Sequence, residues 1–257
     1  MKSLKRLLFY ILSLAPLPHL LQRLLGRDGV SVFTYHGVVE HDLHVSDWSF
    51  LPAKKFEWQM NYLANNFRVL PLDEAFKLQS EGRLPNGKPI AVVTFDDGFY
   101  NNYSVALPIL KRYSIPATIF LATDYVDIDS VKEHRCEDEL WFCRLHSALM
   151  AAMTDDTAVR KGAVQWAGDI YPIVTKDDCQ KTSFRLQQAL KSLPASALEQ
   201  QVSSLCEQLG GRPQGCYEFK MLDYASIDSL KESGLILFGA HTGSHAILAR
   251  LPVREQE

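Results

Sequence analysis

The sequence has no Cys-x-x-Cys pair and no excess of basic residues, and each absence excludes a class of protein. Its 5 cysteines are scattered and odd in number, which argues against a structural zinc knuckle and supports a disulfide framework only weakly. We expect them to be reduced thiols in a reducing compartment. The formal charge of −3 gives no electrostatic footprint for nucleic acid, so we expect no nucleic-acid partner.

Internal repeats and low-complexity segments are also absent. The 257 residues, 47% of them hydrophobic, have the composition of a globular protein and can bury a sizeable core. This length suits one large α/β domain or two small ones. No Gly-x-Ser-x-Gly sequence occurs, which counts against a serine hydrolase built on a nucleophile elbow. Nothing in the sequence indicates an oligomeric state.

The N-terminal segment lacks an uninterrupted apolar run of the roughly 20 residues that a spanning helix needs. Residues 1–28 form an amphipathic or hydrophobic segment, interrupted by Pro16 and Pro18 and flanked by lysines and arginines. Residues 1–25 could lie on a membrane surface as a helix, or pack on the domain, and an uncleaved signal anchor is a third interpretation. We expect a cytoplasmic or membrane-associated protein, with export as the alternative.

The rest of the chain alternates apolar strands with helices, which predicts parallel βαβ units. The expected strands are 29–36, 90–95, 116–123 and 235–240. The segment 54–66 has Phe56, Met60 and Leu63 at helical spacing. The stretch from about 126 to 220 reads as a mostly helical insertion. We therefore assign 29–257 to one domain that carries this insertion.

Polar residues stop three of these strands. The first ends at His36, the second at Asp96 and Asp97, and the last at His241, with His245 close behind. Parallel strands place their carboxyl ends on one rim, where α/β proteins carry their chemistry. Two imidazoles and a carboxylate would suit a borderline divalent ion such as zinc and leave a position open for water.

Each of these features also has an ordinary structural explanation. An Asp-Asp-Gly sequence is commonly a turn or a helix cap. Histidines spaced as His241 and His245 are often hydrogen-bonded structural residues, and His36 could be a core histidine. Their joint occurrence at three strand ends favours the metal site.

Two segments identify a family resemblance. "VVTFDDGFYNNYSVALPILKRYSIPATIFLAT" and "SGLILFGAHTGSHAILARL" resemble the polysaccharide deacetylase family, which is the NodB-homology domain or carbohydrate esterase family 4. The T-F-D-D-G and H-[S/T]-x-x-H boxes carry the likeness, which covers most of residues 29–251. The early "FTYHGV" is similar to the Y-H-x-V element of a circularly permuted branch.

The resemblance implies an α/β fold, a distorted (β/α) barrel, in which Asp97, His241 and His245 hold a divalent metal, expected to be zinc. It implies Asp96 as general base and His36 as general acid. The implied activity is the removal of N-acetyl groups from a glycan or glycan precursor containing N-acetylhexosamine. The implied partner is therefore a carbohydrate, and we expect Phe99 and Tyr100 to contact it, with Trp48 as a further candidate.

The sequence departs from the family pattern at Gly243 and Ala246, where a bulkier residue and a proline are frequent. It also stops at Glu257, soon after the second box. We therefore expect a chain truncated at its C-terminus and a barrel incomplete at that end. A metal- or glycan-binding fragment without catalysis is one alternative function, and an O-acetyl esterase is another.

Overall fold

The computed structural model describes residues 29–127, 139–154, 162–210 and 216–256. The predictions for residues 1–28 and for Cys136 fall outside these ranges. The other four cysteines are free thiols, as the sequence predicts. Within the described part of the chain, no helix is both long and apolar enough to cross a membrane.

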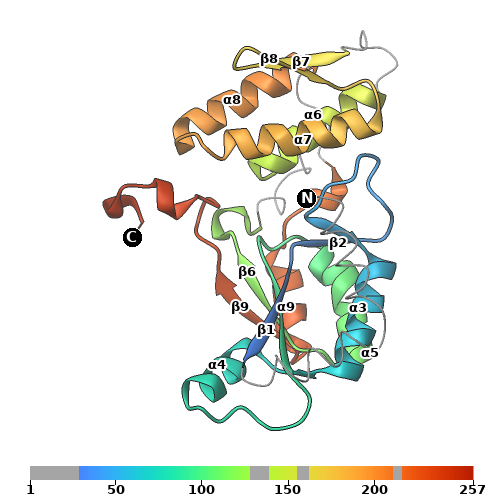
Figure 1. The fold of residues 1–257 in the computed structure, drawn as a ribbon, viewed down its shortest axis with the longest axis vertical. Coiled ribbons are helices and arrows are strands. Elements are labelled where there is room, and N and C mark those ends of the chain that lie inside the picture. Colours follow the sequence, from blue (N-terminus) through green and yellow to red (C-terminus); the bar gives the residue numbers. More distant parts are fainter. Residues whose placement is uncertain (1–28, 128–138, 155–161, 211–215, 257) are drawn as a thin grey trace, which may run out of the picture.

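A parallel sheet forms the lower half of the molecule in Figure 1. Its strands are β1 (Val30–Tyr35), β4 (Arg68–Val69), β5 (Ile90–Phe95), β6 (Ala117–Leu121) and β9 (Ile236–Ala240). The order is β1-β5-β6-β9, and β4 pairs with the beginning of β5. All of these pairs are parallel, which confirms the predicted α/β class.

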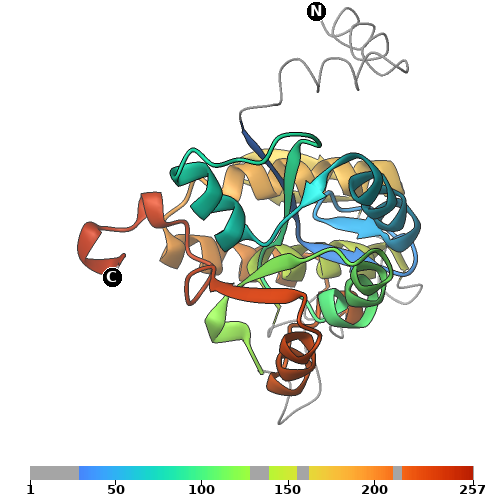
Figure 2. The same cartoon turned by 90° about the horizontal axis from the view of Figure 1, so that it is seen from below.

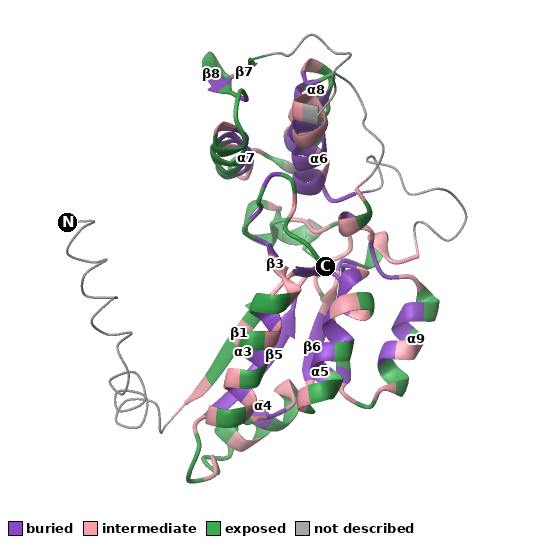
Figure 3. Cartoon of the chain, turned by 90° about the vertical axis from the view of Figure 1, so that its right-hand side faces the viewer, coloured by how far each residue is buried: buried purple, intermediate pink, exposed green. Residues whose placement is uncertain are grey.

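The described sheet is open, because β1 and β9 each pair with a neighbour on one side only among the described strands. This arrangement is consistent with an incomplete barrel, and closure is not seen in these ranges. The central strand β5 is buried along its whole length, as its continuous apolar run predicts. Figure 3 shows this burial running through β5 and β6.

Helices cover the sheet and bury their apolar sides against it. They are α3 (Ala53–Asn66), α4 (Leu72–Ser80), α5 (Leu107–Tyr113) and α9 (Tyr224–Glu232), with a π-helical turn η1 (Asn102–Ala106) before α5. Helix α3 buries Phe56, Met60 and Leu63, the three residues predicted from their spacing. Figure 2 shows α3 and α5 lying side by side. Their apolar residues join those of β5 and β6 in one core.

A second unit lies beyond the carboxyl ends of the strands (Figure 1). It contains α6 (Trp141–Thr154), α7 (Lys176–Leu190) and α8 (Ala195–Gln208), which enclose a core of their own. It also contains an antiparallel hairpin of β7 (Ala163–Trp166) and β8 (Asp169–Pro172), which the sequence analysis did not predict. The turn residues Ala167 and Gly168 both have positive φ. The sequence Ala-Gly did not predict this hairpin turn, because the first turn residue is usually asparagine, aspartate or glycine.

Short elements link the two units. Strands β2 (Gly37–Val39) and β3 (Phe50–Pro52) form a parallel pair directly after His36. The remaining elements are short 3-10 turns: η2 (Thr123–Tyr125), η4 (Tyr217–Phe219), η5 (Leu248–Arg250) and η6 (Val253–Glu255). The rim of the sheet therefore faces the helical unit, and the strand ends lie between the two.

Candidate metal centre

Backbone pairing carries three strands up to their polar ends. The N–H of Asp96 donates to the carbonyl of Tyr35 at 2.9 Å, which places the end of β5 next to His36. The N–H of His241 donates to the carbonyl of Leu121 at 2.7 Å, so β9 stays paired with β6 to its last residue. The predicted meeting of these strand ends at one rim is confirmed.

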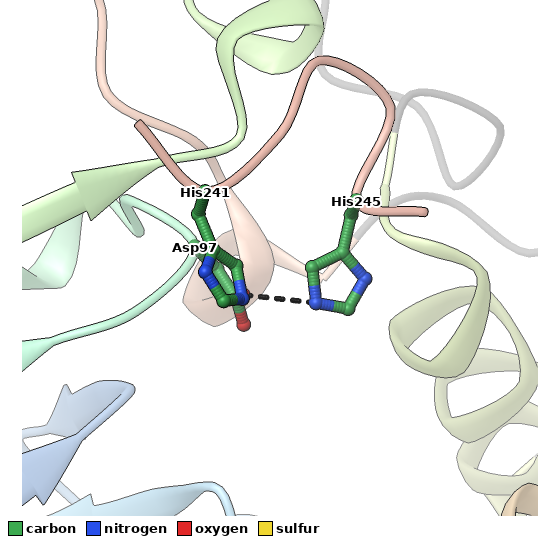
Figure 4. Close-up of side chains that lie close together, drawn as sticks. All are labelled: Asp97, His241 and His245. Carbon is green, nitrogen blue, oxygen red and sulfur yellow. Dashed lines mark ion pairs between the residues drawn. The ribbon is translucent and has the colours of Figure 1, made fainter. Parts of the chain in front are cut away.

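Asp97, His241 and His245 form a compact cluster at this rim (Figure 4). The Asp97 Oδ1 atom lies 3.1 Å from His245 Nε2 and 3.6 Å from His241 Nε2. One candidate ligand atom from each residue lies within 4.8 Å of the others. Two imidazole nitrogens and one carboxylate oxygen at this separation can converge on a single cation.

The Asp97 carboxylate is buried without a hydrogen bond. Only 1% of the residue is exposed, and neither carboxylate oxygen has a hydrogen-bond partner among the described residues. An ionised carboxylate in this state is costly unless an opposite charge compensates it. The donor set and the orphaned carboxylate therefore fit a divalent cation, with zinc suited to the mixture of nitrogen and oxygen ligands.

The backbone is strained at the same residues. Asp97, Thr242 and His245 have φ values of 73°, 66° and 56°, in the left-handed region that residues other than glycine seldom adopt. Each such residue costs about 1–3 kcal/mol, and such residues cluster at functional sites. Two of the three candidate ligands are held in this way, which supports a functional origin for the conformation.

The loop after β6 holds both halves of the cluster in place. The N–H of Ala122 donates to the carbonyl of Asp97, and the N–H of Thr123 donates to the carbonyl of Thr242, both at 3.1 Å. Segments far apart in the sequence are thereby fixed to one another. The position of the ligands does not depend on the short strand ends alone.

The turn between the two histidines is also ordered. The Thr242 hydroxyl accepts a hydrogen bond from the N–H of Ala246 at 3.1 Å, as expected of a residue that caps the turn. A Cβ at Gly243 would lie 2.9 Å from a carboxylate oxygen of Asp124. A larger residue at position 243 would therefore require the Asp124 side chain to move.

Asp96 lies beside the cluster and interacts electrostatically with its residues. Burial raises the pKa of Asp96 above its ordinary value, the positive charge of His241 and His36 lowers it, and Asp97 raises it further. A carboxyl in this setting is a better proton acceptor than an exposed one. His36 is half-buried and lies close enough to Asp96 to affect its pKa.

Asn101 positions the segment that follows His36, a role that the sequence analysis missed. Its side-chain oxygen accepts a hydrogen bond from the N–H of Val38 at 3.0 Å, and its amide donates to the carbonyl of Glu218 at 2.8 Å. One sequence feature could have indicated this role. Asn101 is a polar residue directly after the Asp-Asp-Gly-Phe-Tyr sequence, at the start of a buried helical turn.

The predicted substrate contact of Phe99 is wrong. Its side chain is 0% exposed and packs in the core against Phe50, with ring centroids 4.9 Å apart. A residue directly after a glycine turn can face either side of the rim, and here it faces inward. Tyr100 lies against Tyr217 and Lys220, and its substrate contact stays a prediction.

Gly98 gives a test of how tightly the turn is packed. Its φ is +88°, and an added Cβ would lie 2.6 Å from a methyl carbon of Leu121. Gly98→Ala should lower the free energy of unfolding by about 1 kcal/mol more than Gly82→Ala, because overpacking costs about 1–3 kcal/mol and Leu121 can partly rotate away. Gly82 also has positive φ but has open space around it. Urea unfolding measures both variants, and equal losses would contradict the tight packing.

These observations define an α/β protein with a candidate two-histidine, one-carboxylate metal centre at the carboxyl ends of a parallel sheet. Residues 83–156, which include Asp96 and Asp97, match the family model described as polysaccharide deacetylase. Over these residues the chain is similar to polysaccharide deacetylases, which supports a deacetylase domain of the NodB type.

Curated relatives share part of the sequence. YxkH of Bacillus subtilis, assigned by name as a polysaccharide deacetylase, is 32% identical over 107 residues, which are 41% of this chain and 37% of that protein. The poly-β-1,6-N-acetyl-D-glucosamine N-deacetylase of Staphylococcus epidermidis is 36% identical over 74 residues, 28% of this chain and 25% of that protein. The matches thus span well under half of these relatives' length.

Two solved structures are similar over most of the chain. IcaB from Ammonifex degensii is 20% identical with a TM-score of 0.45, covering 88% of this chain and 59% of that one. A polysaccharide deacetylase from Bacillus cereus is 16% identical with a TM-score of 0.47, covering 90% and 44%.

Proposed function

We propose that this chain is a metal-dependent hydrolase that removes N-acetyl groups from a glycan or glycan precursor containing N-acetylhexosamine. The observation that carries the proposal is the buried Asp97 carboxylate, which has no hydrogen bond and lies within 4.8 Å of ligand atoms from His241 and His245. The relatives named as N-deacetylases of a poly-N-acetylglucosamine support the substrate class. A cytoplasmic or membrane-associated location belongs to this proposal and rests on residues 1–25 alone.

Asp97, His241 and His245 would hold the cation. When bound, a divalent cation such as zinc supplies Lewis-acid polarisation of the acetyl carbonyl and lowers the pKa of a coordinated water. Side chains of this protein must carry out the remaining steps. They must accept a proton from water, donate a proton to the leaving nitrogen and orient the amide.

Asp96 is the proposed general base. It accepts a proton from the attacking water as the water oxygen bonds to the carbonyl carbon, and its burial favours the protonated carboxyl that results. His36 is the proposed general acid; it follows the edge strand β1, whereas His241 follows β9 at the other end of the strand order. It gives a proton to the nitrogen as the carbon–nitrogen bond breaks, because an amide anion is a very poor leaving group. Acetate and a free amino sugar are the products.

The test is acetate release from β-1,6-linked N-acetylglucosamine oligomers, with O-acetylated sugars in parallel. We expect N-acetyl hydrolysis that falls at least tenfold after chelation and returns on addition of Zn²⁺. Release from the O-acetyl sugars alone would replace the proposal with an esterase. Zinc binding without acetate release from either substrate would instead support a binding protein without catalysis.

A further inference from the structure

A groove with two exposed aromatic rings begins next to His36. Trp48 is 60% exposed and Phe184 is 53% exposed, and both line one cavity of about 310 Å³. Single exposed apolar side chains are common and need no explanation. Two aromatic rings that face a shared cavity, within the size range of small-molecule sites, are a stronger sign of a ligand.

Trp48 connects this cavity to the candidate metal centre. Its ring centroid lies 5.3 Å from that of His36, in an edge-to-face arrangement. His36 directly follows Tyr35, whose carbonyl accepts a hydrogen bond from the N–H of Asp96 at 2.9 Å. A ligand with one unit at the metal centre can therefore place its next unit against Trp48.

The loop that carries Trp48 is held rigidly by buried polar groups. Asp47, the residue before Trp48, accepts hydrogen bonds from the N–H of Ser49 at 2.9 Å and from the Gln187 amide at 3.1 Å. His146 on α6 lies 2.8 Å from the carbonyl of Val45 in the same loop. Helices α6 and α7 thus fix the loop on both sides of the exposed ring, and its exposure does not come from a loose tip.

Asp47 also lines the cavity, and Lys191 Nζ lies 5.7 Å from the Trp48 ring centroid, while the remaining polar side chains suit a polyhydroxyl ligand. Asp177 and Lys181 form an ion pair on α7, so their charges offset each other at the groove. Gln180 lies beside them with both a donor and an acceptor. Aromatic faces pack on the apolar faces of pyranose rings, while such polar groups hydrogen-bond to ring hydroxyls.

We propose that the Trp48–Phe184 groove binds the sugar unit next to the one that is deacetylated, so the protein selects an oligomeric or polymeric glycan over a single amino sugar. This inference rests on the proposed function. It assigns the helical unit a role in substrate choice, since Phe184, Gln180 and Lys181 all come from α7.

The experiment compares kcat/KM for N-acetylglucosamine and its β-1,6-linked pentamer. The wild type should prefer the pentamer, and Phe184→Ala should reduce that preference about tenfold, the loss of about 1.4 kcal/mol of binding. Turnover of the monosaccharide should not change, and Phe184→Trp should keep the preference. Phe76→Ala is the matched control, because Phe76 is 71% exposed on α4 and does not line the groove.

Calorimetric binding of the same pentamer separates this inference from the proposed function. Binding that weakens about tenfold in Phe184→Ala, with no acetate released by the wild type, would support the groove and overturn the deacetylase. If the protein releases acetate and Phe184→Ala keeps the wild-type preference for the pentamer, the groove proposal is wrong, whereas the proposed deacetylase function is supported.

Discussion

Asp97→Ala should abolish metal binding and lower kcat/KM about 10³-fold or more. Lewis-acid stabilisation is worth several kcal/mol, and about 4 kcal/mol corresponds to three powers of ten in rate. His241→Ala should have a similar effect, because a two-ligand site holds zinc weakly. Metal content by mass spectrometry and acetate release measure the two outcomes.

The same substitution has a second consequence that does not depend on activity. Excess Zn²⁺ should stabilise the wild type against unfolding, by about 2.7 kcal/mol at a hundred times the dissociation constant. Asp97→Ala should gain nothing from Zn²⁺. Without metal the variant and the wild type should be similarly stable, because removing a buried carboxylate that lacks a hydrogen bond offsets the loss of its contacts with His241 and His245.

Asp228→Ala and His44→Ala are the matched controls, since both residues are exposed and neither belongs to the cluster. Both controls should keep full metal content and turnover. If Asp97→Ala binds one equivalent of zinc as tightly as the wild type, the assignment of the metal centre is wrong.

Asp96→Asn should separate proton transfer from metal binding. Asparagine keeps the shape of the side chain but cannot take up a proton, and general base catalysis contributes about 10²–10⁴-fold to rate. We expect kcat to fall within that range while the zinc content and its stabilising effect persist. Loss of metal in this variant would instead make Asp96 a ligand, and an unchanged kcat would remove it from the mechanism.

Much of the site could be predicted because its residues stand at strand ends. The continuous apolar run Ile90–Phe95 indicates a buried parallel strand, and the residue after such a strand must reach the rim. The same argument places His36 and His241. Asn101 could not be placed in this way, since its role depends on contacts with Val38 and Glu218 that lie far away in the sequence.

Residues beyond the strand ends show the limit of sequence patterns. Phe99 and Trp48 are both aromatic and both follow a strand that ends next to a candidate site residue, yet Phe99 is buried in the core and Trp48 lines a groove. Once a strand ends, the alternation of its side chains no longer applies. The direction of each side chain is then set by whichever distant element packs against it.

By itself, the sequence determined the α/β class, the strands that end in polar residues and the set of acids and imidazoles that meet at the rim. These follow from local periodicity and from the common direction of parallel strands. The tertiary structure alone decided that the Asp97 carboxylate is buried without a hydrogen bond, that the loop after β6 joins the two motifs, and that α7 lines one cavity together with Trp48. Those features depend on packing between segments far apart in the chain, and no local pattern encodes such contacts.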